Sequence, residues 1–278
     1  MDNKISSPLR YPGGKSKLTP FIDNVLYNNQ FSNPIYIEPF AGGAGIALNL
    51  LLSNKVSEIY LNDKDISIYS FWQTILRNKN KLIDKIFKTP ITIDEWLKQR
   101  DIQTNKIKHN QFDIAFSTLF LNRTNRSGII KAGAIGGKSQ SSFWKLDARF
   151  NKETIVNRIE MIHAKKKQIK VFNEDAIEFI NSKIIHLPRK QSLIYFDPPY
   201  YNKGNQLYMN FFEHNDHLKI ATYIKTLKHK WIVSYDDTPE IKEMYKYVKN
   251  TKNIFTRYSA GKSSLGKEIL FASNKLII

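Results

Sequence analysis

The stretch IYIEPFAGGAGIALNLLLSNKVSEIYLND, residues 35–63, decides the fold of this chain. Residues 35–38 are β-branched or aromatic up to the final Glu and predict a buried strand, and residues 46–53 have an apolar helical pattern after a glycine-rich loop. A second strand is predicted at residues 58–61. A strand, a helix and a second strand in close succession are typical of the βαβ unit, in which the two strands lie parallel in one sheet.

The same alternation of strands and helices returns in the C-terminal half. The predicted strands there are residues 171–172, 192–196 and 231–235, and the predicted helices are residues 175–182 and 216–228. Two further strands, at about 253–259 and 268–273, predict a closing hairpin. We therefore predict an α/β fold with a doubly wound, mostly parallel sheet that ends in an antiparallel hairpin.

Helices dominate the predicted middle of the chain. Amphipathic patterns cover residues 66–76, 79–88, 93–101, 109–121 and 152–166. Residues 122–150 differ, because they are rich in Gly, Ser, Asn and Arg with little periodicity, as in a long functional loop. We predict one domain formed by residues 1–77 and 167–278, interrupted by a basic helical insertion at residues 78–166.

The charge of the chain indicates a polyanionic partner. The formal net charge is +18, and residues 98–170 alone hold 16 Lys and Arg against 5 Asp and Glu. Nucleic acid is the leading candidate, although lysine drift in an AT-rich genome also contributes. The chain has no cysteine, which excludes disulfides, thiolate zinc sites and a zinc-dependent base deaminase. An apolar signal core and membrane-length stretches are lacking, so a cytoplasmic protein without a membrane partner is expected.

The tetrapeptide at residues 197–200 carries the most specific chemistry. Asp197 ends a predicted strand, and Pro198 and Pro199 follow it, so the turn presents hydrogen-bond acceptors and no N–H groups. The exocyclic amino group of adenine or cytosine has two N–H donors, which the Asp197 carboxylate and the Pro198 carbonyl would accept, while Tyr200 would stack on the base. The alternative is an ordinary strand-to-loop turn in which Tyr200 packs on the core.

The glycine-rich loop and the end of the second strand predict a cofactor site. Glycines at positions 42, 43 and 45 let a ligand approach the backbone, and Asp63 would accept hydrogen bonds from ribose hydroxyls. The spacing is not the GxGxxG of dinucleotide sites, which disfavours a nicotinamide oxidoreductase. Taken alone, the glycines could simply form a tight turn and Asp63 could simply cap a helix. The glycines and Asp63 together favour an adenosine cofactor.

A second glycine-containing motif, LRYPGGK at residues 9–15, lies near the N-terminus. It lacks the GxxxxGK[ST] spacing of a P-loop and no strand precedes it, so phosphate binding is not expected. Lys15 could instead pair with a carboxylate, and Tyr11 could stack on a cofactor or face its sulfonium. The simpler alternative is that Lys15 marks the start of a helix.

These motifs, taken in order, resemble the Dam-type, class alpha N6-adenine DNA methyltransferases. The resemblance rests on residues 10–15, 38–45, 62–63, 175 and 197–200 and covers nearly the whole chain. It implies the sheet of an S-adenosylmethionine-dependent methyltransferase, S-adenosylmethionine as cofactor with S-adenosylhomocysteine as product, and no metal. It also places a target-recognition region for double-stranded DNA where the basic insertion lies.

The resemblance assigns roles to individual residues. The implied cofactor-binding residues are Tyr11, Lys15, Phe40, Gly42, Asp63, Asp175 and Asp197, and the implied catalytic residues are Asp197, Pro198 and Tyr200. Many relatives have Trp where this chain has Tyr11, but a tyrosine still stacks.

Residues 121–128 are similar to the start of the family's DNA-reading loop. Arg123 and Arg126 would pair with guanine and Asn125 with adenine, whereas Lys138, with Lys131 and Lys145, would suit phosphates. The alternative for any one of these residues is a solvated surface side chain.

We therefore predict transfer of a methyl group from S-adenosylmethionine to the N6 amino group of an adenine flipped out of duplex DNA. N4-cytosine methylation and a non-catalytic DNA-binding module on the same scaffold are the alternatives. The recognition sequence and the oligomeric state stay open. So does the biological context, for which a cognate restriction endonuclease acting on the same site, a phage and a housekeeping role all remain.

Overall fold

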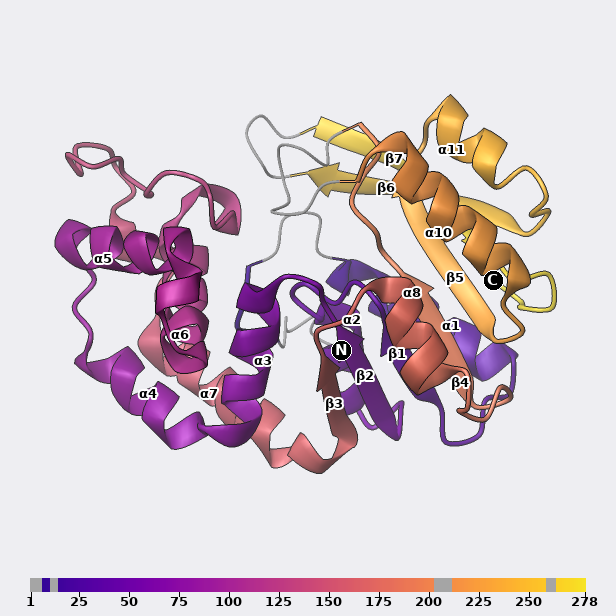
Figure 1. Cartoon of the computed structure of the whole chain (residues 1–278), viewed down its shortest axis with the longest axis horizontal. Helices are drawn as coiled ribbons and strands as arrows, with labels where there is room; N and C mark the ends of the chain where they lie inside the picture. The colour runs from indigo at the N-terminus through magenta and orange to yellow at the C-terminus, as the bar shows by residue number, and fades with distance from the viewer. Residues whose placement is uncertain (1–6, 11–14, 203–211, 259–263) are drawn as a thin grey trace.

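The computed structural model describes residues 7–10, 15–202, 212–258 and 264–278. Its strands form one seven-stranded sheet in the order β3-β2-β1-β4-β5-β7-β6 (Figure 1). They are β1 (Ile35–Glu38), β2 (Glu58–Asn62), β3 (Ile169–Phe172), β4 (Ser192–Phe196), β5 (Lys230–Asp236), β6 (Thr251–Tyr258) and β7 (Ser264–Ala272). Strands β1 to β5 pair in parallel, and β7 pairs antiparallel with both β5 and β6. The predicted α/β fold with a closing hairpin is confirmed.

Helices cover both faces of this sheet. The helices of the described residues are α1 (Thr19–Asn28), α2 (Gly45–Leu52), α3 (Ile66–Arg77), α4 (Lys79–Lys88), α5 (Ile93–Thr104), α6 (Gln111–Thr124), α7 (Lys152–Ala164), α8 (Ala176–Phe179), α10 (His214–Thr226) and α11 (Pro239–Met244). Figure 1 shows α4 to α7 gathered on one side of the molecule, and the β6–β7 hairpin with α10 and α11 on the other.

The side chains of β1 show why the strands are so apolar. Ile35 and Ile37 pack with α8, α10 and α11 on one face, whereas Tyr36 between them packs with α1 and α2 on the other face. Successive side chains of a strand point to opposite faces, so a strand with both faces covered must be apolar throughout. All five residues of β4 are buried for the same reason.

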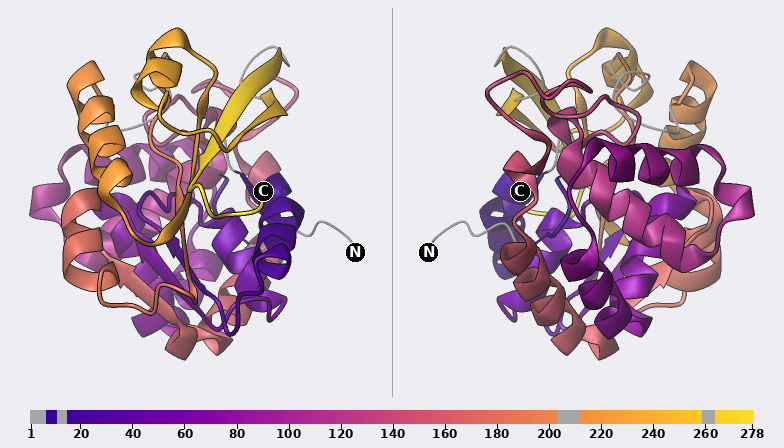
Figure 2. Two further views of the ribbon diagram at one scale, coloured as in Figure 1. Left: turned by 90° about the vertical axis from the view of Figure 1, so that its right-hand side faces the viewer. Right: turned by 90° about the vertical axis from the view of Figure 1, so that its left-hand side faces the viewer.

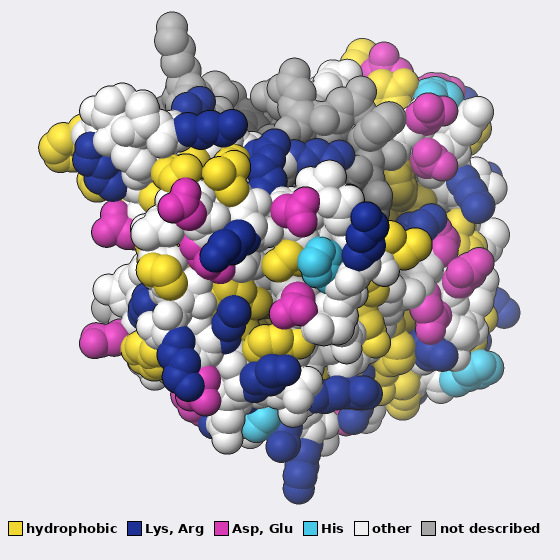
Figure 3. All heavy atoms as spheres, turned by 60° about the vertical axis from the view of Figure 1, so that its left-hand side comes forward, with side chains coloured by type: hydrophobic (Ala, Val, Ile, Leu, Met, Phe, Trp, Pro, Cys, Tyr) yellow, Lys and Arg dark blue, Asp and Glu magenta, His cyan; other side chains and the backbone are white. Residues whose placement is uncertain are grey.

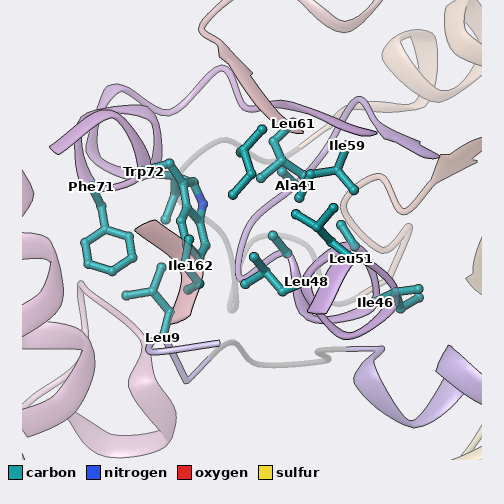
Figure 4. Close-up of a cluster of buried hydrophobic side chains, with 14 of the residues drawn as sticks. Leu9, Ala41, Ile46, Leu48, Leu51, Ile59, Leu61, Phe71, Trp72 and Ile162 are labelled. Atoms are coloured by element: carbon teal, nitrogen blue, oxygen red, sulfur yellow. The ribbon is translucent and has the colours of Figure 1, made fainter. Parts of the chain in front are cut away.

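One hydrophobic cluster joins the sheet to the helical middle of the chain (Figure 4). It brings Leu48 of α2 and Leu61 of β2 together with Phe71 and Trp72 of α3 and Ile162 of α7. Helix α6 packs in turn against α3. The helices after β2 therefore build on the same core as the sheet.

The element positions follow the sequence patterns, with informative exceptions. The expected loop from residue 122 begins later, because α6 runs on to Thr124. The patterns gave no signal for α1 or α11, and the helix expected over residues 175–182 is a short α8 followed by a π-helical turn, Ile180–Ile184. No helix in the described part of the chain is both long and apolar enough to cross a membrane.

The end of the chain returns to its beginning. Figure 2 shows the C-terminus lying against α1, where Asn29 donates a hydrogen bond to the carbonyl of Ile277 and accepts one from its N–H. This contact fixes the last residues on the face of the sheet that α1 covers.

Candidate active site

The predicted site residues follow the carboxyl ends of four neighbouring strands. Phe40 and Gly42 follow β1, Asp63 follows β2, Asp175 follows β3 and Asp197 follows β4. Because β1 lies between β2 and β4, the chain turns in opposite directions on its two sides, and ligand crevices of open α/β sheets form at such a point. The topology thus brings together residues that are more than 150 positions apart.

The glycine-rich loop is held open by backbone geometry. Gly42 has φ of 44° and Ala44 has φ of 47°. Both values lie in the left-handed region, which glycine adopts readily, and this explains a glycine at position 42. The Gly42 N–H donates to Asp63 Oδ2 at 2.9 Å, and the Gly42 carbonyl accepts from the Trp72 indole at 3.0 Å. The Phe40 ring packs edge-on against Phe212, with centroids 5.7 Å apart. The loop backbone is therefore fixed close to the Asp63 carboxylate.

The Asp63 carboxylate accepts backbone hydrogen bonds in a largely buried environment. Its other oxygen, Oδ1, accepts from the Asp65 N–H at 2.9 Å. Burial, with a smaller contribution from the charge of Asp65, raises the pKa of Asp63 to about 7, and the two backbone N–H groups oppose that rise. The side chain remains partly exposed, so its oxygens can accept further hydrogen bonds from hydroxyl groups.

Asn62 ties the ends of three strands together beneath Asp63. Its amide donates to the carbonyls of Pro39 and Glu174, both at 3.0 Å, and accepts from the Glu174 N–H at 3.0 Å. Asp175 follows Glu174 in the chain. Its carboxylate accepts a hydrogen bond from the Ile177 N–H at 3.0 Å and caps the start of α8. Asp175 is thus at the same sheet edge as Asp63, with part of its carboxylate exposed.

The turn at residues 197–200 presents the Asp197 carboxylate, which continues into a chain of buried hydroxyl groups. Asp197 Oδ1 accepts from the Ser234 hydroxyl at 2.7 Å, and the Ser234 oxygen accepts from the Tyr195 hydroxyl at 2.9 Å. Burial raises the pKa of Asp197, whereas Lys15 and Ser234 act to lower it. Among the described residues no hydrogen bond to Asp197 Oδ2 is seen.

Tyr200 lies under the turn. Its side chain is buried, its hydroxyl donates to Glu268 Oε1 at 2.7 Å, and the Lys15 ammonium lies 4.7 Å from its ring centroid. The structure therefore makes Tyr200 an anchor of the turn, where the sequence predicted a surface for stacking on the target base.

Lys15 pairs with carboxylates, as the sequence suggested. Its Nζ lies 2.8 Å from Glu268 Oε2 and 3.6 Å from Asp197 Oδ1, and it also donates to the Tyr200 hydroxyl. The residue stands at the N-cap position of a short 3₁₀ helix, Ser16–Leu18, without capping it through its side chain. Its contact with a cofactor stays a prediction, and Tyr11 lies outside the described residues.

Three functional positions were missed from the sequence. Asp236, at the end of β5, accepts from the N–H groups of Tyr201 and Asn202 at 2.9 and 3.0 Å and so holds the chain after the turn. Its position at a strand end, like those of Asp63 and Asp197, was the signal that could have found it. Ser234 and Glu268 lie inside strands, and no local pattern marks them.

Arg123 and Asn125 are not on the surface. Arg123 is in the last turn of α6, 8% exposed, and its guanidinium donates to the Pro8 carbonyl at 2.6 Å. Burial, followed by the charges of Arg158 and Arg10, lowers its pKa to about 9. Asn125 is fully buried, accepts from the Trp96 indole at 2.6 Å and donates to two loop carbonyls. The expectation that these two side chains project toward DNA is corrected, because they hold the loop from inside.

Other side chains of this segment do project. Arg126 and Lys138 are exposed, and Phe143 and Trp144 are 86% and 57% exposed, an unusual state for large aromatic side chains. Figure 3 shows a row of Lys and Arg side chains along the upper part of this side of the molecule, next to hydrophobic side chains. The DNA-facing character predicted for the segment therefore rests on residues 126–145.

The same segment is fastened to the N-terminal motif. The Asn122 amide accepts from the Arg10 N–H and donates to the Arg10 carbonyl, each at 2.7 Å. Gly128 has φ of 77°, and a Cβ there would meet the Arg10 carbonyl oxygen at 2.3 Å. Only glycine fits this close approach, which couples the start of the loop to the residues that precede Lys15.

The sheet order, with polar residues at its carboxyl edge, is consistent with a methyltransferase of the α/β class. A model of the D12 class N6 adenine-specific DNA methyltransferase family matches residues 11–259. The chain belongs to this family, and it is thereby an adenine-N6 DNA methyltransferase. The alternative of N4-cytosine methylation finds no support in this match.

Two curated relatives agree with the family. Type II methyltransferase M.MjaIII of Methanocaldococcus jannaschii is 22% identical over 237 residues, which cover 79% of this chain and 79% of that protein. Type II methyltransferase M.CviBI of Paramecium bursaria Chlorella virus NC1A is 22% identical over 235 residues, which cover 84% of this chain and 85% of that protein. The similarity therefore extends over most of the length of all three proteins.

Proposed function

We propose that this methyltransferase takes its methyl group from S-adenosylmethionine and delivers it to an adenine flipped out of duplex DNA, with Asp197 as the central catalytic group. The observation that carries this proposal is the Asp197 carboxylate at the switch point of the sheet. Ser234 fixes one of its oxygens, while its other oxygen and the adjacent Pro198 carbonyl remain as acceptors.

The two acceptors suit the two N–H donors of the adenine amino group. Accepting both protons orients the nitrogen and frees its lone pair, which is otherwise conjugated with the ring. An ionised Asp197 then stabilises the positive charge that develops on the nitrogen and takes up the departing proton. Lys15 favours this ionised form, because it counteracts the rise in pKa that burial imposes on Asp197.

The neighbouring residues fit S-adenosylmethionine, which supplies an electrophilic methyl group when it is bound. Asp63 would accept from the ribose hydroxyls, and the fixed backbone at Gly42 permits close approach. Phe40 would line the methionine side, Asp175 would read the adenine, and Tyr11 and Lys15 would contact the cofactor from the N-terminal motif. The partly exposed carboxylates of Asp63 and Asp175 at one sheet edge support this assignment.

The insertion at residues 78–166 is proposed as the DNA-binding region. Arg126 and Lys138 would contact DNA, with the exposed Phe143 and Trp144 beside them. Both relatives are named as type II methyltransferases, which supports a cognate restriction endonuclease acting on the same site as a partner. DNA as substrate supports the cytoplasm as the place of action.

The Asp197→Asn variant tests the catalytic assignment, because it keeps the size of the side chain and removes its charge. We expect methyl transfer into duplex DNA to fall by about 10³-fold, with cofactor binding changed less than threefold. Asp84→Asn, an exposed carboxyl on α4, is the matched control. Wild-type activity of Asp197→Asn would contradict the role, and N4-methylcytosine in digested product DNA would contradict the adenine assignment.

A further inference from the structure

Glu268 is a buried carboxylate that no motif of the site accounts for. It is 0% exposed and lies in β7, opposite Asp236 of β5 on one side and Ile254 of β6 on the other. Figure 1 shows β7 beside β5, and this pairing on both edges fixes the backbone of β7. Glu268 is therefore held by a strand that is paired on both of its edges.

The two oxygens of Glu268 serve two parts of the catalytic site. Oε1 accepts from the Tyr200 hydroxyl at 2.7 Å, and Oε2 lies 2.8 Å from Lys15 Nζ. One carboxylate thus connects the residue after the Pro-Pro turn with the residue that ends the N-terminal motif. These residues are 68 and 253 positions away in the sequence, so only the fold brings them together.

Lys15 lies between two carboxylates and is closer to one of them. Its Nζ is 2.8 Å from Glu268 but 3.6 Å from Asp197 Oδ1. A buried lysine without Glu268 would satisfy its charge on the nearest remaining carboxylate, which is Asp197. Glu268 thereby keeps the ammonium close enough to favour ionised Asp197, yet far enough to leave Asp197 Oδ2 to the substrate.

We propose that Glu268 is a positioning residue for methyl transfer, which acts by holding Lys15 and Tyr200 so that the Asp197 carboxylate stays open to the target amino group. This inference rests on the proposed role of Asp197. Stability alone does not explain the ion pair between Glu268 and Lys15, because buried ion pairs are seldom more stabilising than apolar residues of similar size.

The Glu268→Gln variant tests the inference, since glutamine keeps an oxygen for the Tyr200 hydroxyl and loses the charge that faces Lys15. We expect kcat to fall about 30-fold, while KM for DNA and for S-adenosylmethionine stays close to that of the wild type. The melting temperature should also fall, because the buried Lys15 ammonium loses its nearest partner, and kcat is therefore measured well below that temperature. Glu243→Gln, an exposed carboxyl on α11 that pairs with Lys246, is the matched control and should keep wild-type kcat. Wild-type kcat in Glu268→Gln overturns the proposal, and so does a loss confined to KM or to folding.

A double-mutant cycle separates positioning from general damage. If Glu268 acts through Lys15, the combined Lys15→Met and Glu268→Gln variant should lose little more kcat than the more impaired single variant. Additive losses overturn the proposal. Tyr200→Phe removes only the hydroxyl that Glu268 holds, and it decides the matter if Glu268→Gln does not fold: we expect about a tenfold lower kcat, and a wild-type value overturns the inference.

The outcome is distinguishable from a failure of the proposed function. Asp197→Asn is measured in parallel: activity retained there overturns the role of Asp197, whatever Glu268→Gln shows. Activity lost in Asp197→Asn but retained in Glu268→Gln overturns the positioning role alone.

Discussion

The carboxyl edge of the sheet and the loop of residues 122–150 were both predicted from residue types, and the structure gives those residue types different roles in the two regions. At the edge, Asp63 and Asp197 lie where their strand-end positions placed them. At the start of the loop segment, Arg123 and Asn125 point inward and bind backbone carbonyls. The same polar residue types serve as site residues in one region and as internal scaffold in the other.

The difference has a simple physical cause. A residue at the end of a buried parallel strand has its place fixed by the pairing of the strand, and little freedom remains for its side chain. The side chain of a residue near the end of a helix points toward the core or toward solvent according to its position around the helix axis. Because α6 continues to Thr124 and is buried on all sides from Ile114 onward, Arg123 lies inside the molecule. The boundary of the helix, and not the residue type, decides the function.

The largest expected effect on stability concerns the inner scaffold of the loop. Asn125→Ala removes the acceptor of the Trp96 indole and the donors to Ile129 and Ile130, all in a buried place. We expect the free energy of unfolding to fall by about 3 kcal/mol, because the buried partners lose their hydrogen bonds. Denaturant unfolding checks this value, with the exposed Asn215→Ala of α10 as control. An unfolding free energy equal to that of the wild type would show that Asn125 is not a scaffold residue.

A second test concerns stability at the catalytic edge. Burial raises the pKa of Glu38 from 4.5 to about 8; the charge of Asp197 adds to this rise, whereas hydrogen bonds with Ala47 and Tyr36 oppose it. A carboxyl whose pKa is raised in the folded state contributes stability below its unfolded pKa and loses that contribution as the pH rises through the folded pKa. Between pH 5 and 8 the wild type should therefore lose on the order of 2–3 kcal/mol relative to Glu38→Gln.

Unfolding free energies of both proteins across this pH range provide the measurement. Glu153→Gln, an exposed carboxyl on α7, is the control and should follow the wild type at every pH. Parallel curves for the wild type and Glu38→Gln would mean that Glu38 is not held neutral in the fold. A loss of stability in the wild type relative to Glu38→Gln would show that this edge of the sheet contains a buried carboxyl whose ionisation destabilises the fold.

Much of the fold could be predicted because hydrophobic periodicity reports which faces are covered. The βαβ opening, the apolar strand before Asp197 and the antiparallel end all follow from local patterns. Helix α1 was not predicted, because only Ile22, Val25 and Leu26 of its ten residues are buried and the apolar pattern is weak. Helix α11 is six residues long, too short for a periodic signal.

The site was predictable only where a local motif marks it. The turn at Asp197 and the loop at Gly42 have such motifs, whereas Glu268 and Ser234 are single polar residues within strands. Their roles arise from side-chain contacts between β7, β5 and distant segments, for example Glu268 with Lys15. Such contacts depend on register and packing, which one sequence does not display.

A third prediction tests whether the exposed aromatic side chains belong to the DNA-binding surface. The Phe143 and Trp144 rings contact each other edge-on, and Arg149 lies 5.3 Å from the Trp144 ring centroid. Trp144→Ala should weaken binding of duplex DNA about tenfold, since aromatic stacking on a base contributes about 1–3 kcal/mol. The exposed Tyr27→Ala of α1 is the matched control for loss of a surface aromatic. Equal DNA affinity of all three proteins in a fluorescence titration would exclude this surface.

The smallest expected effects are those of Arg126 and Lys138, whose exposed charges are proposed to meet DNA. A lysine that neutralises one phosphate changes the slope of log K against log salt by about one, so Lys138→Ala should reduce the slope by that amount and weaken binding by less than 1 kcal/mol. Arg126→Ala should do the same if it contacts a phosphate, and should instead relax sequence preference with an unchanged slope if it reads a base. Lys242→Ala on α11, whose ammonium pairs with Asp237, is the control. Unchanged slopes and unchanged sequence preference in both variants would place the DNA elsewhere, and the loop would then be scaffold on its outer as well as its inner side.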